Sequence, residues 1–332
     1  MLSYFIRRMF YMVIVLALVS AVSFYIVNLP PGSWIESYAL ELLAEGGEIA
    51  DQAELDYLTQ RYGLDKPLHI QYLRWIGPIL TRGDFGQSFE WQQPVWNLIR
   101  ERLMLTMIIS GASILFIYAV SIPIALYSAT RQYSIGDYVF SFMGLIGLAT
   151  PNFLLALVFM IVMLKVFGVS PGGLFSPEYL RESWSLAKFW DMVKHLPVPV
   201  IVVGTAGTAE LIRILRGLLL DELEKQYVKT ARAKGVSEWR LIIKYPFRMA
   251  LNPVLSTIGN LLPAIVSGSA IVSVVLGLPT TGPLLLRSLI AQDTYAASSM
   301  LMMLGVLTVL GIFISDLLLM WLDPRIRYER AN

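Results

Sequence analysis

The sequence contains no cysteine, so disulfide bridges, thiolate nucleophiles and cysteine-ligated metals are all excluded. It has two histidines, His69 and His195, which lie too far apart to show the spacing of a metal site. No Walker-type phosphate loop, HExxH motif or GxSxG motif occurs anywhere in the chain. The chain therefore lacks the recognisable machinery for hydrolysing ATP and the residue constellations of common enzymes.

Charged residues are also scarce. They make up 15% of the 332 residues, whereas soluble domains carry roughly a quarter. Hydrophobic residues reach 56%, and the mean hydropathy is +0.63. A net charge of +2 gives no indication of a nucleic-acid partner. This composition is typical of a membrane protein.

Long apolar runs fill most of the chain. A helix needs about 20 apolar residues to cross a bilayer, and lipid leaves no water to satisfy an open backbone. A cleavable signal peptide is the alternative for the first run, but its apolar region would normally be only about 7–15 residues long. We therefore predict an all-α polytopic membrane protein with six transmembrane helices, at about residues 9–29, 103–127, 138–164, 198–215, 253–276 and 298–321.

Basic residues predict the orientation. With the N-terminus inside, the inner face holds 15 Lys and Arg residues and the outer segments hold 10. Both termini and the loop 217–250 are therefore expected in the cytoplasm. The predicted division is a first transmembrane helix (1–29), an extracytoplasmic helical segment (30–102) and a five-helix core (103–332). We expect short helices at 37–43 and 53–62, and interfacial tryptophans in the second outer segment, 168–197.

The loop 217–250 carries a strongly amphipathic stretch at residues 220–247. At helical spacing it has an apolar stripe consisting of Leu220, Leu223, Tyr227 and Ala231. An opposite stripe is charged and consists of Glu222, Lys225, Lys229 and Arg232. A solvated linker is the alternative interpretation, but a linker has little need of an apolar stripe. The pattern favours a docking element.

Local signals divide this stretch into two short helices. Gly235 tolerates the left-handed conformation that ends helices, and Ser237 can cap a second helix with Glu238 in its first turn. Pro246 and Pro253 are expected to close that helix before the next apolar run.

The amino-acid sequence of this loop resembles that of a known family. YVKTARAKGVSEWRLIIKYPFRMALNP, residues 227–253, is similar to the cytoplasmic EAA loop of binding-protein-dependent ABC importer permeases. Lys229, Thr230 and Ala231 occupy the Glu-Ala-Ala places and Gly235 the glycine. Lys229 and Thr230 depart from the general pattern, but TARAKG is usual in the dipeptide, oligopeptide and nickel branch. RYGLDKPLHIQYLRWIGPIL and RGDFGQSF resemble the same branch, and GGLFSPEYLRESWSLAKFWDMVKHL resembles its oligosaccharide-associated permeases.

The resemblance implies a type I ABC importer permease fold in a bacterial or archaeal inner membrane. It implies a second permease subunit, which is either homologous or identical, and two ATPase subunits. It also implies an extracytoplasmic solute-binding protein that meets the outer segments, and the lipid membrane. No cofactor is expected in this chain, whereas ATP and Mg are expected in the ATPases. The chain would then be no enzyme itself. A stand-alone secondary transporter is the alternative, although it would need paired charges and usually an internal repeat, which we do not find.

The resemblance also assigns the predicted ATPase-coupling residues. Four basic side chains would make polar contacts, and Ala231 and Ala233 would allow close approach. The predicted set is Lys225, Tyr227, Lys229, Thr230, Ala231, Arg232, Ala233, Lys234 and Gly235.

Polar residues within the predicted spans give the remaining candidates. Glu210 can pair with Arg213 three residues later, or line a solute path. Asp316 is expected to be a helix-packing or interfacial residue. Ser267 and Ser269 lie in a small-residue patch that either packs helices or lines the path. Peptides, nickel chelates and oligosaccharides all remain open as solutes.

Overall fold

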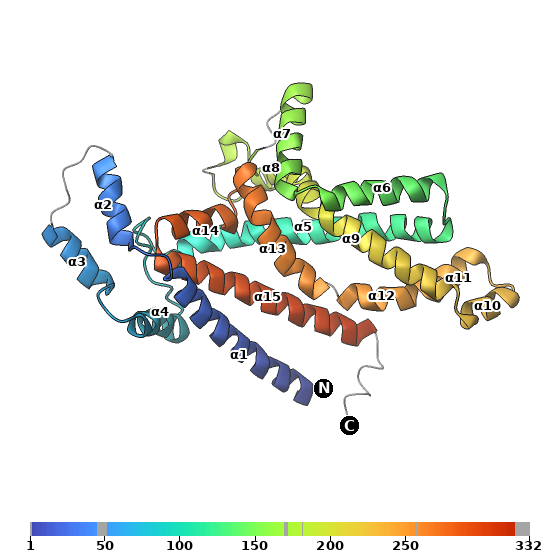
Figure 1. Cartoon of the computed structure of the whole chain (residues 1–332), viewed down its shortest axis with the longest axis horizontal. Helices are drawn as coiled ribbons and strands as arrows, with labels where there is room; N and C mark the ends of the chain where they lie inside the picture. Colours follow the sequence, from blue (N-terminus) through green and yellow to red (C-terminus); the bar gives the residue numbers. More distant parts are fainter. Residues whose placement is uncertain (1, 45–51, 169–171, 181, 257, 323–332) are drawn as a thin grey trace. The chain divides into compact units, whose positions relative to one another are not determined.

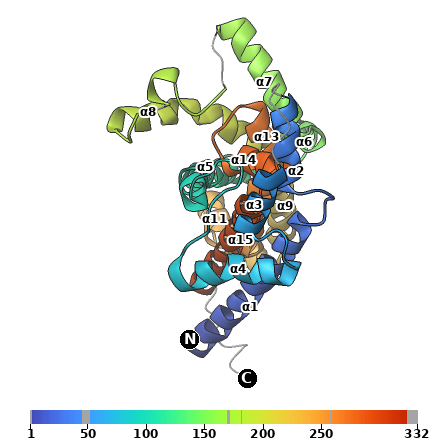
Figure 2. The same cartoon turned by 90° about the vertical axis from the view of Figure 1, so that its left-hand side faces the viewer.

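The structure is a computed structural model that describes residues 2–44, 52–168, 172–180, 182–256 and 258–322. Figure 1 shows its helices in chain order, and Figure 2 gives a second view of the same helices. The described residues form helices and turns with one isolated bridge between Gln87 and Pro94, which confirms the all-α prediction. The helices are α1 (Leu2–Val27), α2 (Trp34–Ala44), α3 (Gln52–Tyr62), α4 (Leu68–Arg82), α5 (Val95–Thr130), α6 (Ile135–Ala149), α7 (Asn152–Phe167), the 3-10 helix η1 (Pro177–Tyr179), α8 (Leu186–His195), α9 (Pro197–Leu223), α10 (Gln226–Ala233), α11 (Glu238–Lys244), α12 (Pro246–Ser256), α13 (Ile258–Val275), α14 (Thr281–Ile290) and α15 (Thr294–Leu322).

Each of the six predicted apolar runs is helical. Within the described residues, four single helices are long and apolar enough to cross a membrane: α1, α5, α9 and α15. The run 253–276 divides between α12 and α13, and residue 257 lies outside the described residues. The predicted short helices at 37–43 and 53–62 are confirmed as α2 and α3.

The transmembrane helix predicted over residues 138–164 is not one continuous helix. The run is broken into α6 and α7, which are bent by 105° at Thr150 and Pro151. Proline has no amide hydrogen to donate and disfavours helical backbone in the residue before it. Thr150 accordingly adopts an extended conformation with ψ 120°, and Pro151 precedes the first residue of α7.

The chain forms two compact units, one of Met1–Leu105 with Thr280–Val309 and one of Thr106–Pro279 with Leu310–Asn332. The division predicted from sequence follows the order of spans along the chain rather than compact units, and it remains a prediction. Residues 280–309 group with the N-terminal third because their side chains share its core.

The core of the first unit is aromatic. Trp75 of α4 is buried, stacks on Phe24 of α1 at a centroid distance of 5.4 Å, and donates from Nε1 to Ser299 Oγ at 3.0 Å. The Asp293 carboxylate accepts a hydrogen bond from Ser88 Oγ at 2.5 Å and one from the Ala296 amide at 3.0 Å, which caps α15. The RGDFGQSF segment is thereby tied to the first turn of α15.

The second unit is built around α9, which packs against α6, α7, α12 and α13. Two glycines let α5 approach α9 closely, because an added Cβ would lie 2.7 Å from Phe116 at Gly204 and 2.7 Å from Ile117 at Gly207. The α9 helix is continuous over 27 residues. At a rise of about 1.5 Å per residue it extends roughly 40 Å.

Candidate functional site

The amphipathic stretch, residues 220–247, begins in the last turn of α9. The predicted stripe from Leu220 to Ala231 is not continuous, because α9 runs on to Leu223 and α10 begins only at Gln226. The buried residues of α10 are Val228 and Ala231. Tyr227, which was expected in the buried stripe, is 39% exposed and donates its hydroxyl to the Glu222 carboxylate. Burial and that carboxylate raise the pKa of Tyr227.

The predicted end of α10 at Gly235 is confirmed. Gly235 has a φ of +75°, its amide donates to Arg232 at 3.0 Å, and the Val236 amide donates to the Ala231 carbonyl at 3.3 Å. These two bonds form a Schellman motif, which satisfies the last carbonyls of a helix and needs a left-handed residue.

The second helix, α11, begins as predicted after Ser237, with Glu238 in its first turn. The Ser237 side chain, however, makes no capping hydrogen bond. Glu238 instead forms an ion pair with Arg232, with Nε to Oε1 at 2.6 Å and Nη2 to Oε2 at 3.1 Å. The paired guanidinium lowers the pKa of Glu238. This bond joins α10 to α11 across the glycine turn, and we call residues 225–244 the coupling hairpin.

Two prolines follow the coupling hairpin. Pro246 is the first residue of α12, where a missing amide hydrogen costs little. Pro253 was expected to end a helix but lies inside α12. The predicted boundary at Pro253 is therefore wrong, because α12 continues to Ser256.

The coupling hairpin has a buried side and an exposed side. Val228, Ala231, Leu241 and Ile242 are buried. Of the predicted coupling residues, the exposed ones are Lys225, Tyr227, Lys229, Thr230, Arg232, Ala233, Lys234 and Gly235. Ala231 thus packs inside the chain, whereas Ala233 lies on the exposed side.

Sequence reasoning missed one prominent surface residue. Trp239, in the first turn of α11, is 68% exposed. A tryptophan beside a run of charged residues was a usable signal, since exposed aromatics are enriched at protein interfaces.

A cavity of about 240 Å³ lies between the coupling hairpin and the ends of two longer helices. Its lining includes Thr130 at the end of α5, Glu224 after α9, and Arg232, Glu238 and Ile242 of the hairpin. The hairpin is therefore seated beside the α5–α6 turn rather than projecting freely.

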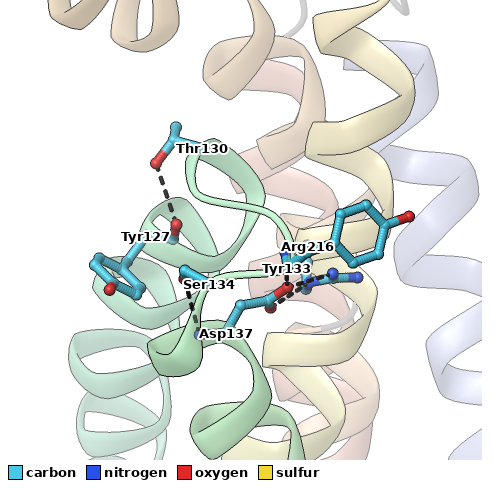
Figure 3. A network of polar contacts seen from close by, with 6 residues as sticks. All are labelled: Tyr127, Thr130, Tyr133, Ser134, Asp137 and Arg216. Atoms are coloured by element: carbon cyan, nitrogen blue, oxygen red, sulfur yellow. Dashed lines mark hydrogen bonds and ion pairs between the residues drawn. The ribbon is translucent and has the colours of Figure 1, made fainter.

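That turn is fixed by a second ion pair, drawn in Figure 3. Arg216 of α9 donates to both carboxylate oxygens of Asp137, from Nε at 2.9 Å and from Nη2 at 2.8 Å. The Asp137 carboxylate also accepts from the Tyr133 amide at 3.0 Å, and Ser134 Oγ accepts from the Asp137 amide at 3.2 Å. The Asp137 side chain is 4% exposed.

The Asp137–Arg216 pair was not predicted. Arg216 was counted only toward orientation, and Asp137 only marked the edge of an apolar run. The two residues are 79 positions apart, so no local spacing could have joined them.

The residues predicted within the spans differ in their exposure. Glu210 and Arg213 are both exposed on α9, and no ion pair joins them in the described part of the chain. Ser267 is exposed, whereas Ser269 is buried and donates its hydroxyl to the Val266 carbonyl at 3.0 Å. Asp316 is half-buried on α15. Ser269 therefore fits helix packing, and Glu210 and Ser267 remain accessible.

Comparison with known families covers nearly the whole chain. Residues 121–328 match the binding-protein-dependent transport system inner membrane component, and residues 1–110 match the N-terminal region of the same type of membrane component. The chain belongs to this family. It is thus a multi-pass inner-membrane transport component, and such components are not enzymes. Family membership favours this assignment over a stand-alone secondary transporter.

Several curated relatives align over nearly their full length. The oligopeptide transport system permease protein AppB of Bacillus subtilis is 34% identical, with 99% of this chain and 100% of that protein covered. OppB of Haemophilus influenzae, an oligopeptide permease, is 28% identical over 99% and 100%. DppB of Lactococcus lactis, a dipeptide permease, is 27% identical over 98% and 100%.

One solved structure shows the same fold. An inward-facing structure of the MetNI methionine ABC transporter aligns with a TM-score of 0.54 and 16% identity, covering 68% of this chain and 96% of that chain. This likeness supports the type I permease fold predicted from sequence.

Proposed function

We propose that this chain is the permease subunit of an ABC importer for peptides. It forms half of the solute path together with a second permease subunit and receives mechanical work from two ATPase subunits. ATP and Mg are held by those partners. The named relatives carry oligopeptides and dipeptides, which supports peptides as the solute. Residues 172–196 resemble the oligosaccharide-associated permeases in sequence, so oligosaccharides are the alternative solute.

The coupling hairpin is the observation that carries the proposal. It combines a buried face, which fixes it to the ends of α5 and α9, with an exposed face of basic side chains around Ala233. Positive-inside counting puts this face and both termini in the cytoplasm, where ATPase subunits are found. The outer segments 30–102 and 168–197 are then available to a solute-binding protein.

The two ion pairs suggest how motion would pass through the chain. The glycine turn joins α10 to α11 and the two helices pack on each other, so a push on either helix would move both; the exposed Arg232–Glu238 pair adds little to this. The Asp137–Arg216 pair fastens α6 to α9 near the same end. A displaced hairpin would therefore carry α9 and α6 as one body, which suits rocking between inward-open and outward-open states.

Exposed charges on α9 support the proposed solute path. Glu210 and Arg213 lie near the middle of this spanning helix. A charge facing lipid at the bilayer centre costs about 2.5–3.5 kcal/mol on insertion scales. This face of α9 is therefore expected to meet water or the second permease subunit, with Glu210 and Ser267 as solute-path candidates.

Copurification tests the proposal. A tagged copy of the chain, extracted under mild conditions, is expected to bring down an ATPase with a Walker motif and a second permease chain. The complex in proteoliposomes should hydrolyse ATP faster when a peptide-loaded binding protein is added. Peptide uptake that proceeds without any ATPase subunit would instead indicate a stand-alone transporter.

A further inference from the structure

The helix α8 has its polar and apolar faces reversed relative to a soluble helix. Leu186, Phe189, Trp190 and Val193 follow the i, i+3, i+4, i+7 spacing of one helical face. Leu186 is 75%, Phe189 43% and Trp190 56% exposed, and Val193 is half-buried. Such an outward apolar stripe is unfavourable in water and indicates that something apolar covers it.

The opposite face of α8 is buried and carries Met192 together with two charged residues, Lys188 and Asp191, whose charged groups are satisfied within the chain. The Lys188 ammonium donates to the Glu182 carbonyl at 2.6 Å and lies 4.9 Å from the ring centroid of Phe175. The Asp191 carboxylate accepts from the amide and the hydroxyl of Ser176, both at 2.7 Å. These bonds fix the rotation of α8 about its axis, so the helix cannot turn its apolar stripe inward.

The neighbouring backbone holds α8 close to the end of a spanning helix. His195 ends α8 and Pro197 begins α9, with one residue between them. The Gly173 amide donates to the Leu276 carbonyl at 2.7 Å, directly after α13, which pins the start of the segment as well. The coupling hairpin follows the other end of α9, so α8 and the hairpin lie at opposite ends of this helix (Figure 1). Since α9 is long and apolar enough to cross a membrane, α8 is then expected at the opposite membrane surface.

We propose that α8 lies flat in the membrane–water interface, with Leu186, Phe189, Trp190 and Val193 inserted between lipid headgroups. The occupant of its outward face is the lipid of the same bilayer that α9 crosses. Interfacial helices bury their apolar face about 5–10 Å deep at the boundary of headgroups and acyl chains, and tryptophan is enriched at that depth. Trp184, just before α8, is 45% exposed and packs edge-on against Phe175 at a centroid distance of 5.9 Å.

A solute-binding protein is the competing occupant, and the structure favours lipid. The exposed stripe offers four apolar side chains, and the exposed charged residue of α8, Lys194, lies at its edge. A lysine at the edge of an apolar stripe suits a membrane interface, because its ammonium can reach the headgroups while its stem lies along apolar surface. The continuity of α8 with α9 also sets it at the depth of the interface without any partner.

Nitroxide accessibility tests this proposal directly. Because the chain has no native cysteine, Leu186→Cys, Phe189→Cys and, as a control on the nearby surface, Glu178→Cys each carry one spin label. The intact transporter is placed in lipid nanodiscs, and collision rates are measured with oxygen, which prefers lipid, and with a water-soluble nickel chelate. Labels at 186 and 189 should collide more with oxygen than with nickel, and the label at 178 should show the reverse.

Three results would overturn the proposal. The first is nickel-accessible labels at 186 and 189 that become protected only when the binding protein is added, which would make this face its docking surface. The second is low collision with both reagents at 186 and 189, which would indicate burial against another protein chain. The third is nickel access at all three positions in every condition. Two test positions guard against the loss of either variant through misfolding.

Discussion

The coupling hairpin and the α5–α6 turn lie at the same end of α9 and each is closed by a bidentate Arg–carboxylate pair. The Arg232–Glu238 pair is exposed, at 50% and 58% of the side chains. The Asp137–Arg216 pair is largely buried, at 4% and 25%. Exposed pairs contribute little, whereas removing one partner of a buried pair leaves an uncompensated charge. The exposed Arg232–Glu238 pair therefore leaves the hairpin surface open to a partner. The buried Asp137–Arg216 pair instead anchors the α5–α6 turn to α9.

The largest effect is expected at the anchor. Asp137→Asn removes the charge that Arg216 faces, and we expect a loss of about 3 kcal/mol, the low end of the range for buried pairs because Arg216 keeps some solvent contact. The readout is the thermal midpoint of the purified chain in detergent. Arg216→Met combined with Asp137→Asn should recover part of the loss. Equal midpoints for the single variant and the parent chain would contradict the anchor role.

The two alanines of α10 sharpen the difference between buried and exposed positions. Ala231→Glu forces a carboxylate into a packed site and should destabilise the chain by about 1–3 kcal/mol. Ala233→Glu, on the exposed side of the same helix, is the matched control. It should leave the thermal midpoint near the parent value while weakening ATP-driven uptake. Equal midpoints for the two variants would show that Ala231 is not packed.

The glycine turn of the hairpin should give a smaller effect. Gly235→Ala is expected to cost about 1–2 kcal/mol, because a Cβ is unfavourable at φ +75°. Gly217→Ala in α9 is the control, since an added Cβ meets nothing within 4 Å at either position and Gly217 has no positive φ. Thermal unfolding of the two variants measures the backbone contribution alone. A larger loss of stability for Gly217→Ala than for Gly235→Ala would show that the positive φ of Gly235 is not the cause of the effect.

The exposed pair should give the smallest effect, and its pH dependence has a definite sign. Arg232 lowers the pKa of Glu238 below its ordinary value of 4.5. The pair therefore stabilises the hairpin above the unfolded pKa and is lost as the pH falls through the folded pKa. Glu238→Gln should leave the thermal midpoint unchanged at pH 7 within the resolution of a melting curve. A large drop at pH 7 would remove the contrast between the two pairs.

The sequence predicted features that rest on local physics. Apolar runs predicted helices because lipid leaves a backbone no other partner, and Gly235 predicted a helix end because few residues adopt positive φ. The resemblance of residues 227–253 pointed to the family that the comparisons show. Pro151 also carried a usable signal for the break between α6 and α7, but its weight within a 27-residue apolar run was underestimated.

Features set by tertiary contacts could not be predicted in the same way. The partners Asp137 and Arg216 are brought together only when α6 packs on α9. The helical stripe through Leu220 and Ala231 failed because α9 continues past the expected end of its span and α10 begins on a new axis. The reversed faces of α8 were hidden because Lys188 and Asp191 find their partners in residues 175–182.

Nucleotide-dependent crosslinking from the coupling hairpin is the most direct test of the whole account. Ala233→Cys gives the cysteine-free chain a single reactive thiol on the exposed face of α10, and the assembled complex is treated with a short bifunctional reagent. The account predicts a covalent product with an ATPase subunit, in a yield that changes when ATP is bound. A thiol that is modified by a membrane-impermeant reagent from outside the cell, or that links to no other chain, would contradict it.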